Sequence, residues 1–503
     1  MTGEIRKEFT EAQSAKKREQ VLKDPAHPLY HLTGPVGWVN DPNGLCQKDG
    51  VNHLFYQYTP QSPDGSGWRG WGHYTTRDWI HYQEEDDPLV PDGLADQGGS
   101  YSGSALVEED TIRFFYTANR KLPGDHDYIC SGRIHWTLEF DSPDGEHFTG
   151  RKVLLKNRDY PENVSCHVRD PKVWKKDGRY FMVLGARTMN DLGEVLVYES
   201  PDLKSWKLKE IISSEKRLGY MWECPDVFEM DETDWMIFCP QGVREEFETD
   251  QDSVCAFGKI RGLYEGNPLL EEVSLLDYGP DFYAPQSFVD ESGRRILQGW
   301  MGHPETGEQN PTLENGWQHQ FAIPRLLSVK NGKLRQELLP ELRNLAHDES
   351  EIHLEAGKTW QMPTRSMLLD LQMPYGDWKL DFRSGVKITL ENGQLSIDLN
   401  EHGAGRKKRT FQTGPVSRLQ IVSDSSSLEF FINDGEKTFS TRIYDQEADQ
   451  LQIRCSVPLH GRAWKMNPIQ VTWKPEKNQE EGRFVPAGLP EGEWNPVPEE
   501  NDR

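Results

Sequence analysis

Most of the chain alternates between short apolar or aromatic runs and clusters of Gly, Pro, Asp and Asn. Before residue 336, runs of four to seven residues end repeatedly in such turn-forming residues, and no long segment has the 3.6-residue period of an amphipathic helix. Short runs bounded by turn residues predict β-strands joined by tight turns. The clearest predicted strands are residues 52–58, 111–117, 180–184, 195–198, 234–238 and 295–300.

Two of the predicted turns resemble each other. Residues 77–82 read Arg-Asp-Trp-Ile-His-Tyr and residues 201–206 read Pro-Asp-Leu-Lys-Ser-Trp, so both combine an Asp-containing turn with an aromatic residue after a strand. Many short strands with a repeated turn are typical of a β-propeller, and a large β-sandwich is the alternative. The recurrence does not by itself give a number of blades.

The region after residue 335 starts differently and then returns to the strand pattern. Residues 336–346 predict a short helical linker, and its leucines predict a buried contact between two domains. Residues 347–475 have the strand spacing of a β-sandwich, and Asn392-Gly393 is a strong hairpin signal within them. The strands predicted there are residues 367–373, 378–382, 386–390, 395–399, 427–432 and 451–456.

The two ends of the chain are predicted to lie outside both domains. Residues 1–28 are highly charged and predict a polar helical extension that stops at Pro25 and Pro28. Residues 476–503 are rich in Glu, Pro and Gly and predict a tail that lies along the surface or is disordered. The predicted fold is therefore all-β, with a first domain at residues 29–335 that is a β-propeller or a large sandwich, and a C-terminal β-sandwich at residues 347–475.

Composition narrows the possible partners. The 503 residues include 57 Lys and Arg against 82 Asp and Glu, a net charge of -25 that disfavours nucleic acid and anionic membranes as partners. The seven Cys are odd in number and form no CxxC pair, which argues against a disulfide framework and a structural zinc site. The N-terminus lacks an apolar signal core, and no stretch approaches the ~20 apolar residues of a membrane span, so we expect a cytoplasmic protein.

The first segment with candidate chemistry surrounds Asp41. Residues 37–44 read Gly-Trp-Val-Asn-Asp-Pro-Asn-Gly, which is by itself an ordinary turn sequence. However, a nucleophilic carboxylate needs a rigid backbone, hydrogen bonds that keep it ionised and a flat surface for its substrate. Trp38, Asn40 and Pro42 supply these features, and the 16 Trp of the chain suit a protein that stacks sugars.

Two further acids lie in comparable settings. Asp170 follows Arg169, which can keep the carboxylate ionised, and the pair could grip vicinal hydroxyls; a surface ion pair is the alternative. Glu223 stands among Met, Trp, Cys and Pro in residues 221–228, so desolvation would raise its pKa if it faces inward, as suits a general acid. Asp226 is a rival for this role, and an ordinary Glu at a strand end is the other alternative.

In this order, the segments resemble glycoside hydrolase family 32, which contains invertases, inulinases, fructan exohydrolases and sucrose-6-phosphate hydrolases. The resemblance is strong over about residues 29–330 and rests on domain layout beyond them. The segments that carry it are Trp38-Val39-Asn40-Asp41-Pro42-Asn43-Gly44, Phe55-Tyr56-Gln57-Tyr58, Trp71-Gly72-His73, Tyr101-Ser102-Gly103-Ser104-Ala105, Arg169-Asp170-Pro171, Glu223-Cys224-Pro225-Asp226, Asp281-Phe282-Tyr283-Ala284-Pro285-Gln286-Ser287-Phe288 and Gly299-Trp300-Met301.

The resemblance implies a five-bladed β-propeller with the site at one end of its channel, followed by a β-sandwich. It implies a retaining, exo-acting β-fructofuranosidase that cleaves sucrose and short fructo-oligosaccharides without a metal or organic cofactor. Asp41 would be the nucleophile, Glu223 the acid/base, and Asp170 the residue that holds fructose hydroxyls and steadies the transition state. The implied substrate contacts are Asn40, Gln57, Trp68, Trp71, Tyr101, Ser102, Arg169, Tyr283 and Trp300.

Two departures from the family pattern leave the substrate open. Trp68 precedes Trp71 by three residues where the family often has five, the loop before Trp68 is longer, and Tyr101 replaces the commoner Phe. A transfructosylase and a sucrose-6-phosphate hydrolase are therefore alternatives on the same fold. The second would need a basic group near the glucose subsite, for which Arg69, Arg120 and Arg187 are candidates. A fructan-binding lectin is disfavoured because all three acids are present.

Overall fold

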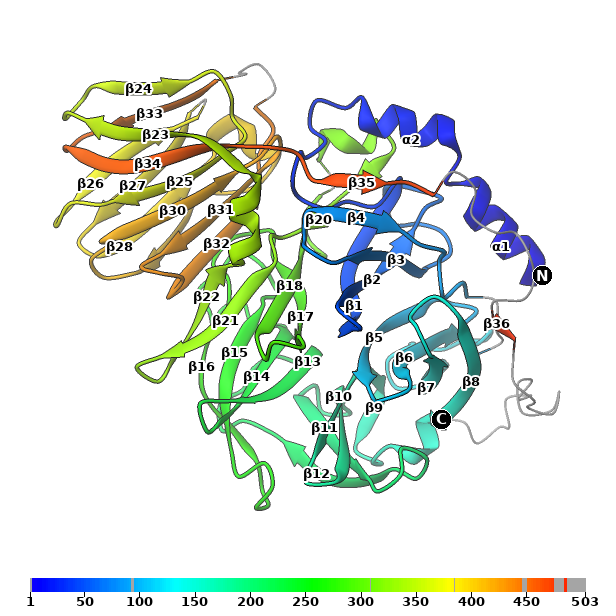
Figure 1. The fold of residues 1–503 in the computed structure, drawn as a ribbon. Coiled ribbons are helices and arrows are strands. Elements are labelled where there is room, and N and C mark those ends of the chain that lie inside the picture. The colour runs from blue at the N-terminus through cyan, green and yellow to red at the C-terminus, as the bar shows by residue number, and fades with distance from the viewer. Residues whose placement is uncertain are drawn as a thin grey trace.

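The computed structural model describes residues 2–91, 95–307, 309–383, 385–445 and 450–474, and the backbone of residues 484–485. Figure 1 shows a two-sheet sandwich beside a larger group of sheets, with two helices lying against the larger group. The all-β prediction is confirmed, since the helices α1 (Thr2–Glu11) and α2 (Ala15–Leu22) and short 3₁₀ turns are the non-strand elements of the described residues.

The larger group consists, within the described residues, of five sheets whose strands mostly follow one another in the chain. Hairpins between neighbouring strands explain why each sheet is antiparallel along most of its width. The first sheet contains β19 (Trp317–Gln318), β1 (Gly37–Lys48), β2 (Val51–Thr59), β3 (Gly70–Thr76), β4 (His81–Glu84) and β35 (Gln470–Thr472). The second contains β36 (Phe484–Val485), β8 (Phe148–Leu155), β7 (Arg133–Ser142), β6 (Ile112–Lys121) and β5 (Ser100–Val107). The third contains β12 (Lys207–Ile212), β11 (Gly193–Ser200), β10 (Arg179–Thr188) and β9 (Val164–Lys176). The fourth contains β13 (Met221–Met230), β14 (Thr233–Gln241), β15 (Ala256–Arg261) and β16 (Leu269–Leu275), and the fifth contains β17 (Tyr283–Val289), β18 (Arg295–Met301), β20 (Gln320–Phe321), β21 (Arg325–Lys330) and β22 (Lys333–Leu338).

The first strands of these sheets contact one another in a cycle. β1 contacts β5, β5 contacts β9, β9 contacts β13, β13 contacts β17, and β17 contacts β1 again. Apolar side chains fill the space between neighbouring sheets, as where Val183 and Val197 of the third sheet meet Met236 and Phe238 of the fourth. Aromatic and aliphatic side chains buried between neighbouring strands in this way hold adjacent sheets together.

A β-bulge interrupts each of these five first strands at a similar place. In every case two residues of the first strand lie opposite one residue of the second strand, which breaks the alternation of side chains between the two faces. Four of the five bulges end in or are followed at once by Pro, which lacks the N–H that a regular ladder would need. The bulged pairs are Asn40-Asp41 in β1, Tyr101-Ser102 in β5, Asp170-Pro171 in β9, Cys224-Pro225 in β13 and Ala284-Pro285 in β17.

The recurrent Asp-containing turn joins the third and fourth strands of three sheets. Asp78 accepts hydrogen bonds from the backbone of Ile80 and His81, and Asp202 does the same for Lys204 and Ser205. A third copy, which the sequence comparison did not include, is formed at Asp144 between β7 and β8. An Asp that bonds the backbone two and three residues on stabilises such a turn.

The second part of the molecule is a sandwich of two six-stranded sheets. A continuous apolar cluster, which includes Leu369, Trp378, Phe382 and Phe430, fills the space between them. One sheet contains β23 (Ala346–Leu354), β34 (Leu459–Met466), β25 (Met367–Gln372), β30 (Arg418–Ser423), β31 (Ser427–Ile432) and β32 (Lys437–Arg442). The other contains β24 (Thr359–Met362), β33 (Leu451–Cys455), β26 (Trp378–Phe382), β27 (Val386–Glu391), β28 (Gln394–Asp398) and β29 (Arg409–Gln412).

The predicted strands agree with the observed ones, and the linker differs. Each predicted run lies in or within one residue of a strand, and the Asn392-Gly393 turn joins β27 to β28 with positive φ at both residues. The predicted helix at residues 336–345 is instead the end of β22 and a 3₁₀ helix, Pro340–Leu345. Gln336 pairs with Leu327 in β21, and buried Leu334 and Gln336 alternate with more exposed neighbours as in a strand. The predicted tail at 476–503 lies, apart from the short strand β36, outside the described residues.

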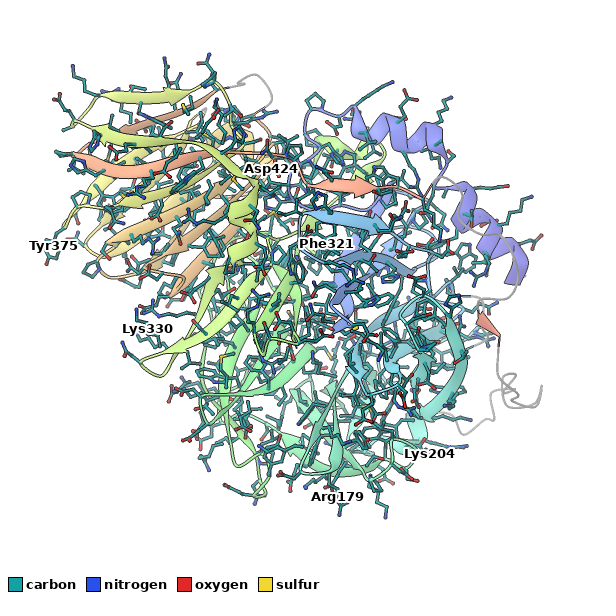
Figure 2. All side chains as sticks on the ribbon, in the orientation of Figure 1. Arg179, Lys204, Phe321, Lys330, Tyr375 and Asp424 are labelled. Carbon is teal, nitrogen blue, oxygen red and sulfur yellow. The ribbon has the colours of Figure 1, made fainter. Side chains whose placement is uncertain are left out.

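Buried charged groups join the two parts of the molecule. Asp424 lies near Phe321, where the sandwich meets the sheets (Figure 2). His31 bonds Asp424 at 2.8 Å and Glu429 at 3.0 Å, and both acids belong to the sandwich. Arg325 of β21 extends this network to Glu429 at 2.6 Å. Because a buried charge costs free energy unless it is paired, these ion pairs fix how the two parts dock.

The N-terminal helices pack on the first sheet. Phe9 of α1 makes an edge-to-face contact with Tyr58, and Arg18 of α2 forms a bidentate ion pair with the buried Glu84. Glu8 accepts a hydrogen bond from the indole of Trp68 at 3.1 Å. The helices therefore also hold the loop that precedes β3.

Candidate active site

The bulges of the five first strands converge on a cavity of roughly 400 Å³. Side chains of a regular strand alternate between the two faces of the sheet. A bulge breaks this alternation, so that two neighbouring residues of one strand both reach the cavity. The residues that line it are Trp38, Asn40, Asp41, Gln57, Arg69, Tyr101, Ser102, Arg133, His135, His167, Arg169, Asp170, Glu223, Tyr283, Trp300 and Pro304. The three predicted acids are thus brought together, although they lie up to 182 positions apart in the chain.

Asp41 lies at the second position of the β1 bulge with both carboxylate oxygens occupied. Asn40 donates to Oδ1 at 3.0 Å, the Ser102 hydroxyl donates to Oδ2 at 2.5 Å, and the Cys224 thiol lies 3.7 Å from Oδ2. Gln57 supports this arrangement by donating to Ser102 at 2.9 Å. Burial raises the pKa of Asp41, while the bonds from Ser102 and Asn40 lower it.

Asp170 lies at the first position of the β9 bulge with a positive φ of 63°. Its backbone N–H donates to Thr117, and its Oδ2 accepts the backbone N–H of Cys224 at 3.0 Å. Burial, together with the nearby charge of Glu223, raises the pKa of Asp170 to about 7 although Arg169 opposes this shift. A non-glycine residue held in the left-handed region stores backbone strain, which is common at functional sites.

Glu223 immediately precedes the β13 bulge and accepts four hydrogen bonds. Arg169 donates to Oε1 through Nη2 at 2.6 Å and through Nε at 3.2 Å. The Tyr283 hydroxyl and the Gln241 amide donate to Oε2 at 2.6 and 2.8 Å. Arg169 therefore bridges two predicted acids, since its Nε is also 3.8 Å from Asp170. Gln241 was not predicted, and it pairs with Met221 at the end of β14, where the sequence carries no distinguishing signal.

Asp226, the sequence rival of Glu223, faces a different environment. It is fully buried, accepts the backbone N–H of Ser287 at 2.5 Å and pairs with Lys172 at 3.2 Å. It is absent from the residues that line the cavity. The two-residue bulge between Glu223 and Asp226 separates the two acids, so that Asp226 ties β13 to β9 and β17 instead.

Two tryptophans form an apolar wall of the cavity. The rings of Trp38 and Trp300 are 5.9 Å apart at 56°, and both contact the ring of His319 edge to face. Trp38 also donates to Asn40 at 3.0 Å, which fixes the ring beside Asp41. Flat apolar rings next to hydrogen-bonding acids suit a ligand that has both apolar C–H faces and hydroxyl groups.

Trp68 and Trp71, predicted as substrate contacts, do not line the cavity. Trp71 is 0% exposed and donates its indole N–H to the Tyr101 carbonyl at 3.1 Å, so it supports the β5 bulge from behind. Trp68 donates to Glu8 of α1. The regular pairing of β3 directs Trp71 into the core. Trp68 instead contacts the N-terminal helix α1, and the sequence did not predict how this helix packs.

A basic side of the cavity was mostly missed by the sequence reading. Arg69, Arg133, His135 and His167 all line it, whereas of the three arginines named in advance, Arg120 and Arg187 do not. The sequence does contain a signal for this basic side. The motifs Arg-x-His in β7 and His-x-Arg in β9 each place two basic residues on the same face of a strand.

The described residues contain no group of three or more His, Cys, Asp or Glu side chains arranged to hold a metal ion. Within the same residues, neither helix is long and apolar enough to cross a membrane. The cavity instead offers three carboxyl groups, one guanidinium between two of them, an aromatic wall and a basic side. A pair of carboxyl groups beside an aromatic wall is the arrangement that glycoside hydrolases use for catalysis.

Comparison with known proteins agrees with this chemistry. The chain belongs to glycoside hydrolase family 32: the model described as "Glycosyl hydrolases family 32 N-terminal domain" matches residues 31–338, and the one described as "Glycosyl hydrolases family 32 C terminal" matches residues 379–459. The family resemblance inferred from the sequence is therefore confirmed, and the protein is a hydrolase.

Similar proteins of the family include sucrose-6-phosphate hydrolases and a β-fructofuranosidase. The sucrose-6-phosphate hydrolase of Klebsiella pneumoniae is 36% identical over 465 residues, which cover 90% of this chain and 96% of the relative. The structure of sucrose-6-phosphate hydrolase from Lactobacillus gasseri aligns with a TM-score of 0.81 at 28% identity and covers 91% of this chain and 96% of that one. A Bombyx mori family 32 β-fructofuranosidase variant in complex with sucrose aligns with a TM-score of 0.79 at 25% identity, over 93% of this chain and 99% of that one.

Proposed function

We propose that this protein hydrolyses sucrose 6-phosphate to fructose and glucose 6-phosphate. This is narrower than the sucrose-cleaving β-fructofuranosidase expected from the sequence, and it is one of the alternatives named there. The similarity to sucrose-6-phosphate hydrolases supports it. The observation that carries it is a pair of arginines in the cavity, Arg69 and Arg133, that have no acid partner among the described residues.

Neither arginine forms an ion pair with a described residue. Arg133 donates to the Tyr128 carbonyl at 3.1 Å and to Asn119 at 3.0 Å, both uncharged groups. Arg69 reaches the Gly65 carbonyl at 3.5 Å, and its Nε is buried without an acceptor. In a chain with a net charge of -25, two half-buried guanidiniums without a carboxylate are a costly arrangement unless a ligand supplies the negative charge. A phosphate group matches the fork of donors on Arg.

The two histidines share hydrogen-bond acceptors with Arg133. Asn119 Oδ1 accepts from both His135 and Arg133 at 3.0 Å, which ties the two side chains together. His167 bonds the Tyr128 carbonyl through Nε2 and Arg169 through Nδ1, each at 3.0 Å. Burial and the nearby Arg169 lower the pKa of His167 to about 3, so its neutral ring accepts from Arg169 and leaves the cations without competition for an anion.

In the proposed reaction, Asp41 attacks the anomeric carbon of fructose while Glu223 protonates the departing glucosyl oxygen. A covalent fructosyl-enzyme results, and Glu223 then deprotonates the water that releases fructose with retained configuration. Ser102 and Asn40 hold the attacking carboxylate. Arg169, bonded to Glu223 and near Asp170, balances the negative charge as protons move.

The proposal extends to fold and location. The five sheets are proposed to be the blades of a five-bladed β-propeller, a reading supported by the cyclic contacts of β1, β5, β9, β13 and β17. Domain limits at residues 29–335 and 347–475 remain proposals as well. Because an anionic sugar phosphate does not diffuse across a lipid bilayer, the enzyme is proposed to act in the cytoplasm.

The test compares kcat/KM for sucrose 6-phosphate and for sucrose in the parent and in Arg133→Ala. Loss of a charge-assisted contact to phosphate is worth about 1.5–3 kcal/mol, so kcat/KM for sucrose 6-phosphate should fall about 10- to 150-fold. The value for sucrose should stay within about twofold, and Arg133→Lys should restore part of the loss.

Arg187→Ala is the matched control. Arg187 pairs with Asp191 at 2.6 Å outside the cavity, so its removal should change neither substrate's kcat/KM. Equal losses for both substrates in Arg133→Ala, or a parent enzyme that prefers sucrose, would overturn the assignment of sucrose 6-phosphate.

A further inference from the structure

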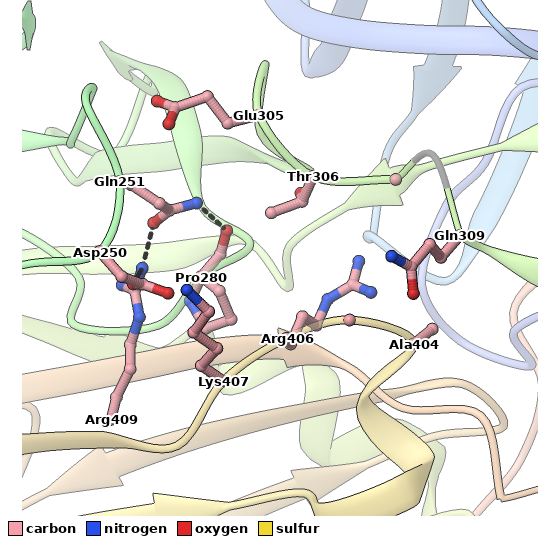
Figure 3. A pocket seen from close by; sticks show the side chains of 12 residues that line it. Asp250, Gln251, Pro280, Glu305, Thr306, Gln309, Ala404, Arg406, Lys407 and Arg409 are labelled. Carbon is pink, nitrogen blue, oxygen red and sulfur yellow. Dashed lines mark hydrogen bonds and ion pairs between the residues drawn. The ribbon is translucent and has the colours of Figure 1, made fainter.

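A second cavity, of roughly 210 Å³, lies between the loop that follows β18 and the sandwich. Figure 3 shows its walls: Glu305, Thr306 and Gln309 along the top and segment 404–409 of the sandwich along the bottom, with Asp250 and Gln251 at one side. None of its lining residues belongs to the catalytic cavity. The lining residues are Asp250, Gln251, Pro280, Glu305, Thr306, Gly307, Gln309, Ala404, Gly405, Arg406, Lys407 and Arg409.

The floor of this cavity carries a concentrated basic run. Residues 406–409 read Arg-Lys-Lys-Arg in a chain whose net charge is -25. Arg406 is fully committed, because Asp281 accepts from it at 2.5 and 2.8 Å and Asn310 accepts at 3.0 Å. Lys407, in contrast, is exposed and forms no ion pair with any residue that the structure describes.

Arg409 is only partly satisfied. Its two terminal nitrogens bond the Gly279 carbonyl at 2.9 Å and Asp250 at 2.8 Å, whereas its Nε is buried and has no acceptor. A buried donor without a partner costs about 1–3 kcal/mol. The free ammonium of Lys407 and the guanidinium of Arg409 come from one segment of the sandwich and line one cavity, so together they can hold a single anionic group (Figure 3).

The opposite wall offers hydroxyl-binding groups. The Gln309 amide makes no hydrogen bond within the described part of the chain, and it packs against Gly405, whose φ is +89°. Thr306 and Glu305 line the same wall. Amides, hydroxyls and carboxylates that face a cation across a space larger than one phosphate group suit a small polyhydroxylated anion.

We propose that this cavity is a second ligand site that binds a hexose phosphate, with the phosphate on Lys407 and Arg409 and the sugar hydroxyls toward Gln309 and Thr306. The proposal goes beyond the hydrolytic activity, and the site does not require that sucrose 6-phosphate be the substrate. Glucose 6-phosphate, the product of the proposed reaction, has the required chemistry.

The same loop forms a wall of both cavities. Pro304 lines the catalytic cavity, and Glu305 and Thr306 line the second one. The intervening turn is anchored by Glu305, which accepts the backbone N–H groups of Asp252 and Ser253 at 2.9 Å each. His303 contacts the ring of Tyr283, whose hydroxyl bonds Glu223 at 2.6 Å. An occupant of the second cavity therefore restrains the loop that borders the catalytic acid.

The experiment measures glucose 6-phosphate binding by calorimetry on the full chain in four forms: the parent, Arg133→Ala, Lys407→Ala and Lys408→Ala. Arg133→Ala should weaken binding to the catalytic cavity about 10- to 150-fold, so the second site dominates the binding observed in that background. Loss of a charge-assisted contact should weaken this site about tenfold or more in Lys407→Ala. Lys408, next in sequence but absent from the lining, is the matched control and should leave the affinity within twofold.

Hydrogen exchange gives the second readout. Glucose 6-phosphate should slow exchange in residues 303–307 of Arg133→Ala, and it should fail to do so when Lys407→Ala is added. A single binding site that Arg133→Ala abolishes, or equal weakening by Lys407→Ala and Lys408→Ala, would overturn the second site. Inorganic phosphate or glucose binding as tightly as glucose 6-phosphate would overturn the hexose phosphate as its ligand. Failure of the proposed function would instead appear as unchanged hydrolysis in Arg133→Ala, with the second site intact.

Discussion

The catalytic cavity and the junction between the sheets and the sandwich are built from the same residue types with opposite electrostatic results. At the junction, Arg406 binds Asp281 through two hydrogen bonds and lowers the pKa of that carboxyl. Hydrogen bonds from His31 likewise lower the pKa of the buried Asp424 to about 2. In the cavity, burial and neighbouring acids raise the pKa of Asp170 to about 7 and also raise that of Asp41.

Burial alone does not account for this difference, since all four acids are buried from solvent or nearly so. A direct hydrogen bond from a cationic group does. At the junction Arg406 bonds Asp281 and His31 bonds Asp424, whereas in the cavity Arg169 bonds Glu223 and lies 3.8 Å from Asp170, and Asp41 is held by neutral donors. An acid that is hydrogen-bonded by a cation stabilises the fold. An acid without such a bond can still exchange a proton or attack a substrate. Asp-to-Asn substitutions in the two regions should therefore have different consequences.

The largest expected effect is on turnover in Asp41→Asn. An amide of the same volume is too weak a nucleophile, so kcat should fall about 10⁴-fold or more. Because Asp41 has no ion pair among the described residues, the melting temperature should change by only a few degrees. Steady-state kinetics and thermal melting check both statements. Turnover within tenfold of the parent would remove Asp41 from the nucleophile's role.

Asp281→Asn should do the reverse and reduce stability while sparing the chemistry. Removing one partner of a buried ion pair leaves Arg406 uncompensated and costs about 3–5 kcal/mol of unfolding free energy. Urea unfolding followed by fluorescence measures the loss. Asp250→Asn is the matched control, because Asp250 is 36% exposed and its pair with Arg409 should be worth less than about 1 kcal/mol. Equal losses in the two variants would contradict the contrast between paired and exposed acids.

Glu223→Ala should slow hydrolysis about 10²–10⁴-fold through the loss of general acid–base assistance. Azide needs no base, so with a substrate that has a good leaving group it should restore the second step and yield β-fructosyl azide. Product analysis by NMR tests the retained configuration. Asp226→Ala should instead lose stability without azide rescue, since Asp226 pairs with Lys172. Azide rescue of Asp226→Ala would move the acid/base role to that residue.

Asp170→Asn should raise stability at pH 8, by at most about 4 kcal/mol, because one unit of pKa shift corresponds to ~1.4 kcal/mol. The folded-state pKa of about 7 lies above the usual value of 3.8, so the folded parent binds a proton that the unfolded chain releases between these pH values. The parent's stability therefore rises as pH falls from about 7 toward 4, and the variant lacks this rise. Thermal melts from pH 4 to 8 measure the difference. A variant less stable than the parent at pH 8 would show that Asp170 is well paired in the folded state.

The strands and the family could be predicted from the sequence because both depend on local signals. Turn residues mark the ends of the strands, and Asp41, Asp170 and Glu223 each stand within one residue of a bulge that Pro also marks. The sequence predicted less well whether a given side chain points into the core or into the cavity. Trp71 lies where the alternation of β3 is regular and points into the core, whereas a bulge releases Tyr101 to the cavity.

Contacts between segments that lie far apart in the chain were also not predicted from the sequence. Arg133 becomes a cavity residue only because β7 lies across β6 from β5 and because the second and third sheets are neighbours. Trp68 is covered by a helix that starts about 60 residues earlier in the chain. Neither relation leaves a periodic signal, so the basic side of the cavity and the role of the helices required the structure.

The first sheet also sets the order in which the molecule can be completed. It takes β1 to β4 from the start of the chain, β19 from residues 317–318, and its outer edge, β35, from residues 470–472. At ~5–20 residues per second, about 20–80 s separate the synthesis of β4 from that of β35 on a ribosome. During that interval β4 presents an uncovered strand edge, the kind of surface on which nascent chains associate. Slower translation or a missing C-terminal segment would therefore reduce the yield of soluble protein through the earliest strands of the chain.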